Sequence, residues 1–226
     1  MRITLALLLS AMLLGSAQNA LADCTDTLYG KAASGYILKD VGAEASDQPV
    51  VQGGATRTCG RLSYDLWVSG GLAGDTANEI DLSVYYDDQV GPLKVQLAAQ
   101  YFFVSLDDSL GEPKDDIVAG YADLSLPVTR GRLTIAPLVR FVQLVGVKDL
   151  PNEGIVQPGV RGSFALDDRT TLSADIRHPI SSRGYSFFRV TTSLSRQVTE
   201  RFAAQAGWED TDQTPSVFWF GGKYNF

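Results

Sequence analysis

The sequence contains a single histidine and only two cysteines, which leaves little material for metal or nucleophilic chemistry. It has no spacing typical of a zinc site, no P-loop and no dinucleotide fingerprint. Acidic residues outnumber basic residues by 26 to 19, so the chain offers no basic footprint for nucleic acid. We therefore expect no cofactor, no metal ion and no nucleic-acid partner.

Long hydrophobic runs are also missing. Beyond residue 22, no apolar stretch approaches the roughly 20 residues that a transmembrane helix needs. The chain is nevertheless 45% hydrophobic, and its apolar residues alternate with polar ones, which is typical of strands. Within a bilayer every backbone N–H and C=O must be paired, so a sheet that spans it has to close. The sequence thus predicts an all-β fold, a transmembrane antiparallel up-and-down β-barrel.

The first 22 residues predict a cleavable secretory signal peptide, which leaves residues 23–226 as one outer-membrane barrel domain. Arg2 begins the segment, an apolar core spans residues 5–14, and Ala20-Leu21-Ala22 forms a small-x-small cleavage site. A lipid anchor on Cys24 is the competing interpretation. Asp23 disfavours it, because the residue before a lipidated cysteine is normally small and neutral.

About twelve segments alternate in this way, although ten strands are also compatible with the sequence. The predicted spans are 26–38, 47–57, 60–70, 78–87, 92–104, 115–126, 131–144, 154–166, 169–178, 185–196, 200–209 and 215–226. The connections between them are alternately short and long, as the periplasmic turns and outer loops of a membrane barrel are. With an even strand count, this sorting predicts that both termini lie in the periplasm.

The C-terminal segment predicts the closing strand. Phe226 ends the chain, Tyr224 lies two residues before it, and Gly221 completes a Gly-x-x-aromatic-x-aromatic pattern. This pattern resembles the signal that the barrel assembly machinery recognises, so we expect that machinery as a partner. The alternative is a soluble β-protein that ends in phenylalanine.

The two cysteines predict one disulfide. Cys24 begins the mature chain and Cys59 lies in the first short turn, so both are expected on the oxidising periplasmic side. The alternative is two free thiols in that compartment.

The polar faces of the strands predict a charged lumen, since apolar side chains must face lipid. The residues expected to line it are Asp65, Glu79, Asp81, Lys94, Asp123, Arg140, Arg161, Asp175, Arg177, Arg189 and Lys223. The earlier strands contribute mostly acids and the later strands mostly bases, so the two signs are expected on facing walls. Two interpretations stay open: the walls create a transverse field across a narrow water-filled pore, or the charges pair across the lumen and close it.

Several stretches of the N-terminal third resemble the TorF-type porin family of proteobacteria. They are residues 34–41 (SGYILKDV), 49–54 (PVVQGG), 64–69 (YDLWVS) and 78–86 (NEIDLSVYY). The chain departs from the family pattern where Lys39-Asp40 replaces Arg-Gly. The resemblance implies an outer-membrane barrel with a channel role, and it supplies no catalytic residues.

Three functions follow from these patterns, and the first is a channel that passes small polar or ionic solutes by diffusion. The second is a closed-lumen barrel that acts in binding or structure through its outer loops. The third is a lipid-modifying enzyme at His178, which Ser181 and Ser182 follow. We expect no enzyme, because Pro179 interrupts the strand and the His-x-Ser spacing of such hydrolases is missing. The remaining expected partners are outer-membrane lipid and lipopolysaccharide.

Overall fold

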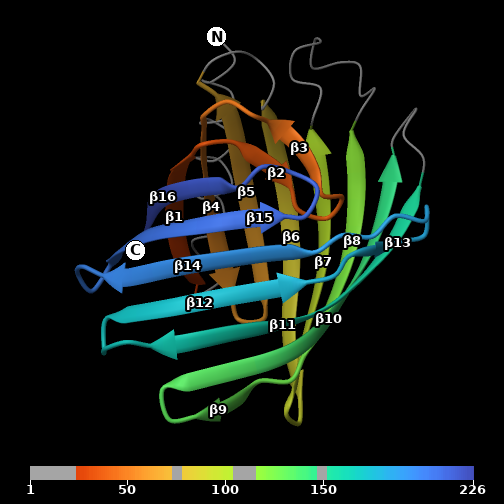
Figure 1. Cartoon of the computed structure of the whole chain (residues 1–226). Helices are drawn as coiled ribbons and strands as arrows, with labels where there is room; N and C mark the ends of the chain where they lie inside the picture. The colour runs from red at the N-terminus through yellow and green to blue at the C-terminus, as the bar shows by residue number, and fades with distance from the viewer. Residues whose placement is uncertain (1–23, 73–77, 104–115, 147–151) are drawn as a thin grey trace.

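The computed structural model describes residues 24–72, 78–103, 116–146 and 152–226 (Figure 1). The expected signal peptide, residues 1–22, lies outside the described residues. No described segment forms a helix long and apolar enough to cross a membrane.

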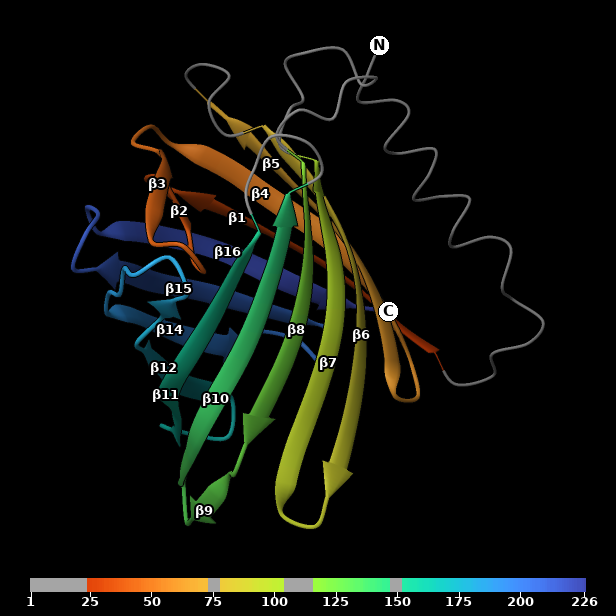
Figure 2. The same ribbon diagram turned by 90° about the vertical axis from the view of Figure 1, so that its right-hand side faces the viewer.

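Twelve antiparallel strands of the described chain form one closed ring (Figures 1 and 2). In ring order they are β1 (Cys24–Ala33), β4 (Val50–Cys59), β5 (Leu62–Gly71), β6 (Glu79–Val90), β7 (Leu93–Phe103), β8 (Ile117–Ser125), β10 (Leu133–Gly146), β11 (Glu153–Ala165), β12 (Thr170–Arg177), β14 (Arg189–Gln197), β15 (Phe202–Thr211) and β16 (Val217–Asn225). Each strand pairs with the next, and β1 pairs with β16 to complete the ring. The predicted twelve-stranded up-and-down barrel is confirmed.

Four further short strands of the described residues are not part of this ring. β9 (Val128–Arg130) pairs with β10, and β13 (Ile180–Ser181) pairs with β11. β2 (Tyr36–Leu38) and β3 (Ala43–Ser46) pair only with each other and form a separate hairpin within the connection from β1 to β4.

The barrel has an apolar outside and a polar inside. Large hydrophobic side chains on the outer face are exposed, including those of Leu97, Phe141, Leu194 and Phe220. The buried polar side chains include Glu79, Asp81, Gln157, Arg177 and Arg189. This arrangement inverts that of a soluble protein and is stable only where the outer face meets hydrocarbon.

Short turns at one end of the barrel depend on glycine. Gly60, Gly91 and Gly131 have φ values of 60°, 61° and 59°, in the left-handed region that L side chains rarely adopt. Each lies directly after a strand of the wall or its short extension. These tight turns fix the register of the hairpins that they join.

The seam between β1 and β16 requires close backbone contact. Seven residue pairs connect the two strands, from Thr27–Asn225 to Ala33–Trp219. A Cβ atom added at Gly221 would lie 2.1 Å from the carbonyl oxygen of Gly30, so no other residue fits there without a shift of the backbone.

The other edge of β1 is fixed to β4 covalently and by charge. Cys24 and Cys59 are register partners and form a disulfide, as predicted. In the same ladder, Asp26 faces Arg57, and the Nε–Oδ1 distance of this ion pair is 3.0 Å.

Several predicted strand boundaries differ from those of the structure, and the largest difference is at the end of the first strand. The first strand ends at Ala33 and not at residue 38, because residues 36–38 continue the alternating pattern but belong to β2. The chain leaves the wall at Ser34 and Gly35, where the backbone N–H of Ser34 donates to the carbonyl of Phe218.

We expect a charge on the outer face to destabilise the barrel. Leu194 lies near the middle of β14 and is 43% exposed. Leu194→Lys should lower the free energy of unfolding by about 2–4 kcal/mol, because its ammonium group would enter the bilayer midplane. Urea unfolding in lipid vesicles measures the change. The matched control is Ser193→Lys, whose side chain points into the lumen; an equal loss in both variants would contradict the assignment of faces.

Candidate functional site

The β2–β3 hairpin crosses the lumen. The hydroxyl of Tyr36 donates to Oε2 of Glu79 on β6 at 2.7 Å. The carbonyl of Lys39 accepts a hydrogen bond from Arg189 on β14 at 2.9 Å. In the ring order, β6 and β14 are six strands apart in both directions, so the hairpin contacts opposite walls.

Asp40, at the turn of the hairpin, fixes it to a third part of the wall. Its Oδ1 accepts a hydrogen bond from Gln157 of β11 at 2.8 Å, and its Oδ2 accepts one from Tyr121 of β8 at 3.2 Å. Arg140 of β10 forms a longer ion pair with it at 4.0 Å. Gln157 is fully buried, so this network determines where the hairpin lies.

Apolar contacts complete the docking of the hairpin. Val41 packs against a buried cluster on the inner face that consists of Ala119, Val142, Leu144 and Ile155. Gly42 has a φ of 65° and lies against the ring of Phe187, which would be 2.8 Å from an added Cβ atom. The hairpin therefore fills the lumen beside β8, β10 and β11.

Three predicted lumen acids lie on β5 and β6. Asp65 accepts hydrogen bonds from Tyr29 at 2.8 Å and from Thr56 at 2.5 Å. Glu79 accepts from Tyr36, and Asp81 accepts from Gln100 at 2.7 Å. These three carboxylates form what we call the acidic wall.

The basic wall lies on β11, β12 and β14, around one carboxylate. Arg177 and Arg161 contact Asp175 at 2.7 and 3.0 Å through their Nε atoms. Arg189 approaches the same carboxylate to 3.9 Å. Three guanidinium groups share one carboxylate, so this cluster carries a net positive charge.

Asp123 and Arg140 do not follow the expected separation of charges. They are register partners on adjacent strands, and Nε of Arg140 lies 2.7 Å from Oδ1 of Asp123. A second bond joins Nη2 to Oδ2 at 2.5 Å, so the pair is bidentate. The expectation that these two residues stand on facing walls is wrong, because charge compensation occurs between neighbouring strands.

The remaining predicted residues, Lys94 and Lys223, are exposed near the ends of β7 and β16. The sequence prediction missed four charged residues: Lys31, Lys39, Asp40 and Glu209. Lys39 pairs with Glu209 at 3.6 Å, and Lys31 lies over the ring of Trp219 at 5.4 Å. Lys31 and Glu209 lie on the inner faces of their strands, so strand alternation could have identified them. The hairpin residues gave no such signal.

A cavity of about 640 Å³ lies between the hairpin and the barrel wall. Its lining includes Glu79 and Asp81 from the acidic wall, Arg189 from the basic wall, and Tyr36 and Asp40 from the hairpin. The cavity therefore exposes both signs of charge to any solute that enters it.

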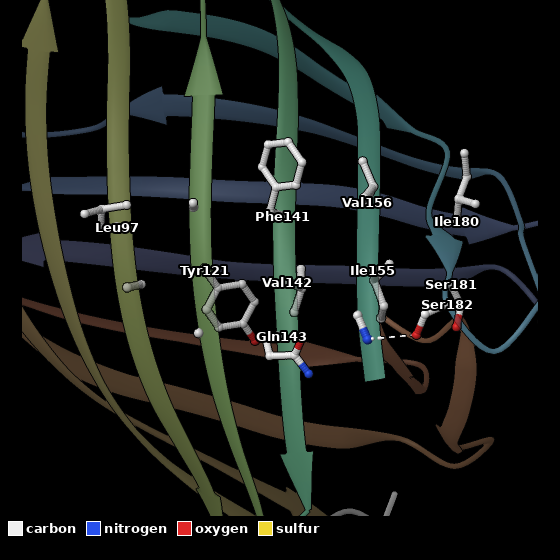
Figure 3. A pocket seen from close by; sticks show the side chains of 14 residues that line it. Leu97, Tyr121, Phe141, Val142, Gln143, Ile155, Val156, Ile180, Ser181 and Ser182 are labelled. Carbon is white, nitrogen blue, oxygen red and sulfur yellow. Dashed lines mark hydrogen bonds between the residues drawn. The ribbon is translucent and has the colours of Figure 1, made fainter. Parts of the chain in front are cut away.

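Figure 3 shows a second hollow, of about 880 Å³, which is shallow and mostly apolar. Its margins include Leu97, Phe141, Val156 and Ile180, which are exposed side chains of the outer face. Gly120 leaves a gap between them. We assign the outer margin of this hollow to the surface that faces lipid. Its inner part reaches Ala98 and Tyr121, which also line the polar cavity of the lumen.

The side chain of His178 contacts two residues at the end of the connection formed by residues 178–188. Its Nδ1 donates to the carbonyl of Phe187 at 3.0 Å, and its ring stacks on Phe188. Ser181 donates its hydroxyl hydrogen to Glu153, and Oγ of Ser182 accepts from the N–H of Gly154 at 3.0 Å. These contacts explain the three side chains as structural elements of this connection.

Tyr185 belongs to the same connection. Burial and the carboxylate of Glu153 raise the pKa of Tyr185 to about 12, so its phenol stays neutral at physiological pH.

Solved porin structures share this fold. The chain resembles a NanC porin with a TM-score of 0.61 and 10% identity, over 88% of this chain and 98% of that chain. It resembles a KdgM porin with a TM-score of 0.62 and 9% identity, over 89% and 99%. A KdgM porin in complex with disordered oligogalacturonate gives a TM-score of 0.63 at 9% identity, over 89% and 99%. At these identities the likeness shows the fold alone, a closed antiparallel β-barrel of the kind found in outer-membrane proteins.

No family model and no curated protein matches the sequence.

We expect Asp40 to hold the hairpin in the lumen. Asp40→Ala should leave the buried amide of Gln157 without its partner, at a cost of about 1–3 kcal/mol, and release the hairpin. A spin label on the exposed residue Glu44 would report the release as a more mobile spectrum. Asp47→Ala is the matched control, because Asp47 is exposed in the same segment. An unchanged spectrum in Asp40→Ala would contradict the anchoring role.

Proposed function

We propose that this chain is an outer-membrane porin through which small polar or ionic solutes diffuse. The cavity between the hairpin and the wall is the observation that carries the proposal, because it is polar, charged and enclosed by a barrel with an apolar exterior. The interior of such a barrel provides an aqueous path only if side chains and inserted segments leave space. About 640 Å³ is space of that kind, narrowed on one side by the hairpin.

The two charged walls act on the solute. The acidic wall and Arg189 stand on opposite sides of the ring, so a transverse field crosses the cavity. The bases on β11, β12 and β14 contact a carboxylate of their own wall and form no ion pair with the acidic wall among the described residues. A dipolar or zwitterionic solute would align with this field, and large ions of either sign would be slowed.

The cellular setting follows from the same features. The porin fold and the resemblance to the TorF-type family support an outer-membrane location. We propose that both termini face the periplasm and that Gly221, Tyr224 and Phe226 engage the barrel assembly machinery. The exposed apolar band would contact outer-membrane lipid, and the longer connections at the opposite end would contact lipopolysaccharide.

The ligand of one structural neighbour does not transfer to this chain. A KdgM porin has been solved with oligogalacturonate, which is a chain of carboxylates. Here Asp65, Glu79 and Asp81 face the same lumen and would repel such a polyanion. We therefore propose small solutes rather than acidic oligosaccharides.

A closed barrel that acts through its outer loops is the second candidate. The observation that favours it is the hairpin, which contacts opposite walls and thus obstructs the lumen. The two candidates differ in whether the remaining cavity conducts.

Single-channel recording in planar bilayers tests the porin. We expect the wild-type barrel to give small discrete steps of conductance. Replacement of residues 36–46 by a short Gly-Ser linker should raise the step several-fold, because the hairpin narrows the path. If neither protein conducts, the closed barrel is the correct alternative. Equal steps in both would show that the hairpin does not limit the pore.

Ion selectivity tests the role of the basic wall. Arg177→Ala should shift the reversal potential in a salt gradient toward cation selectivity, since it removes a positive charge from the lumen. Arg196→Ala removes the same charge from the exposed outer face of β14 and should leave the reversal potential unchanged. An identical shift in both variants would mean that surface charge, and not the lumen, determines selectivity.

A further inference from the structure

Two carboxylates of the acidic wall each have one oxygen without a donor. Tyr36 and Gln100 satisfy Oε2 of Glu79 and Oδ2 of Asp81. The other oxygens, Oε1 of Glu79 and Oδ1 of Asp81, are buried and have no hydrogen-bond partner within the described part of the chain. The two residues are 3% and 5% exposed. Buried carboxylate oxygens of this kind need either a proton or a compensating positive charge.

The two side chains lie together. They are two residues apart on β6, so both point into the lumen with their Cα atoms roughly 6–7 Å apart. The two carboxyl groups are within hydrogen-bonding distance of each other, so a shared proton is the alternative to a bound cation. Both line the lumen cavity, so an ion in the water of the lumen can reach them without crossing the wall.

The protein's own cations serve other carboxylates. Asp26, Asp123 and Asp175 each pair with an arginine. Among the residues that the structure describes, no lysine or arginine forms a salt bridge with Glu79 or Asp81. The charge of this pair must therefore be offset by a proton that the two carboxyl groups share or by a cation from outside the described protein.

We propose that Glu79 and Asp81 bind a hard divalent cation of the Ca²⁺ type through Oε1 and Oδ1. Two carboxylates balance the charge of such an ion, and oxygen ligands match its preference. The described residues contain no group of three or more His, Cys, Asp or Glu side chains that could hold a metal, so water from the cavity completes the coordination shell. The site deepens the porin proposal, on which it rests, by placing a cation-binding step in the path of the solute.

The same wall provides a matched control. Asp65 carries the same charge and lines the same cavity, but donors satisfy both of its oxygens. If the effect of Glu79 and Asp81 were only that of wall charge, Asp65 would contribute equally. If they form a site, Asp65 should be dispensable for binding.

Sensitised Tb³⁺ luminescence measures the binding directly. Tb³⁺ occupies oxygen sites for Ca²⁺ and emits when a nearby aromatic ring is excited. Trp67 is the register partner of Asp81, and its ring lies 5.7 Å from that of Tyr36. The folded full-length barrel in detergent should therefore give a saturable signal that added Ca²⁺ displaces.

Glu79→Gln and Asp81→Asn should each weaken Tb³⁺ binding by about tenfold or more, which corresponds to roughly 1.4 kcal/mol. Asp65→Asn should bind like the wild type. Heat-modifiable migration on a gel checks that each variant is folded, and Ca²⁺ displacement in the wild type remains decisive if one variant does not fold.

Two results would overturn the site: no sensitised signal from the wild type, or an equal loss of binding in Asp65→Asn. The first would indicate that a shared proton neutralises the pair, and the second that the wall attracts cations without a defined site. Because the signal does not depend on conductance, binding without current would remove the porin and keep the site. Current without Tb³⁺ binding would keep the porin proposal and remove the cation site.

Discussion

Closure of the sheet between β1 and β16 is the constraint on which the rest of the structure depends. A hydrocarbon surrounding cannot satisfy a free strand edge, so the last strand must pair with the first. The seam achieves this with seven residue pairs and with Gly221, whose missing side chain permits contact with the backbone of Gly30. Once the ring is closed, strand alternation assigns every side chain to lipid or to lumen. The polar lumen is therefore a consequence of closure.

A polar lumen creates a second requirement, which is the compensation of buried charge. Most of the charged side chains meet it locally: Arg140 pairs with Asp123 across one strand pair, and three arginines surround Asp175. Local pairing keeps the two walls apart, whereas pairing across the lumen would have closed it. Glu79 and Asp81 differ from the other buried carboxylates, because each has a buried oxygen without a hydrogen-bond partner and neither forms an ion pair within the described chain. This lack of a local ion pair is the reason why we propose a bound cation at Glu79 and Asp81.

The sequence was sufficient for the features that strand alternation controls. The twelve segments, their faces and the closing strand all follow from a period of two, as does the apolar outer band. It was not sufficient where the chain leaves the wall. Residues 36–38 have the same alternation as the strand before them, so the pattern extended that strand to residue 38 although it ends at Ala33. Nor could alternation show which charges are neighbours, because register relates residues far apart in sequence, such as Asp123 and Arg140.

The β2–β3 hairpin shows why the sequence could not predict the arrangement inside the lumen. A segment that enters the lumen displaces water that hydrogen-bonds to the wall and to the segment itself. Its polar groups therefore need hydrogen-bond partners on several strands at once. Asp40 has them on β8, β10 and β11, and Lys39 has them on β14 and β15. None of these contacts can be inferred from the hairpin sequence, because each depends on the complete ring being present. The width of the lumen is thus a property of the folded barrel as a whole, because it depends on contacts between the hairpin and several strands of the wall.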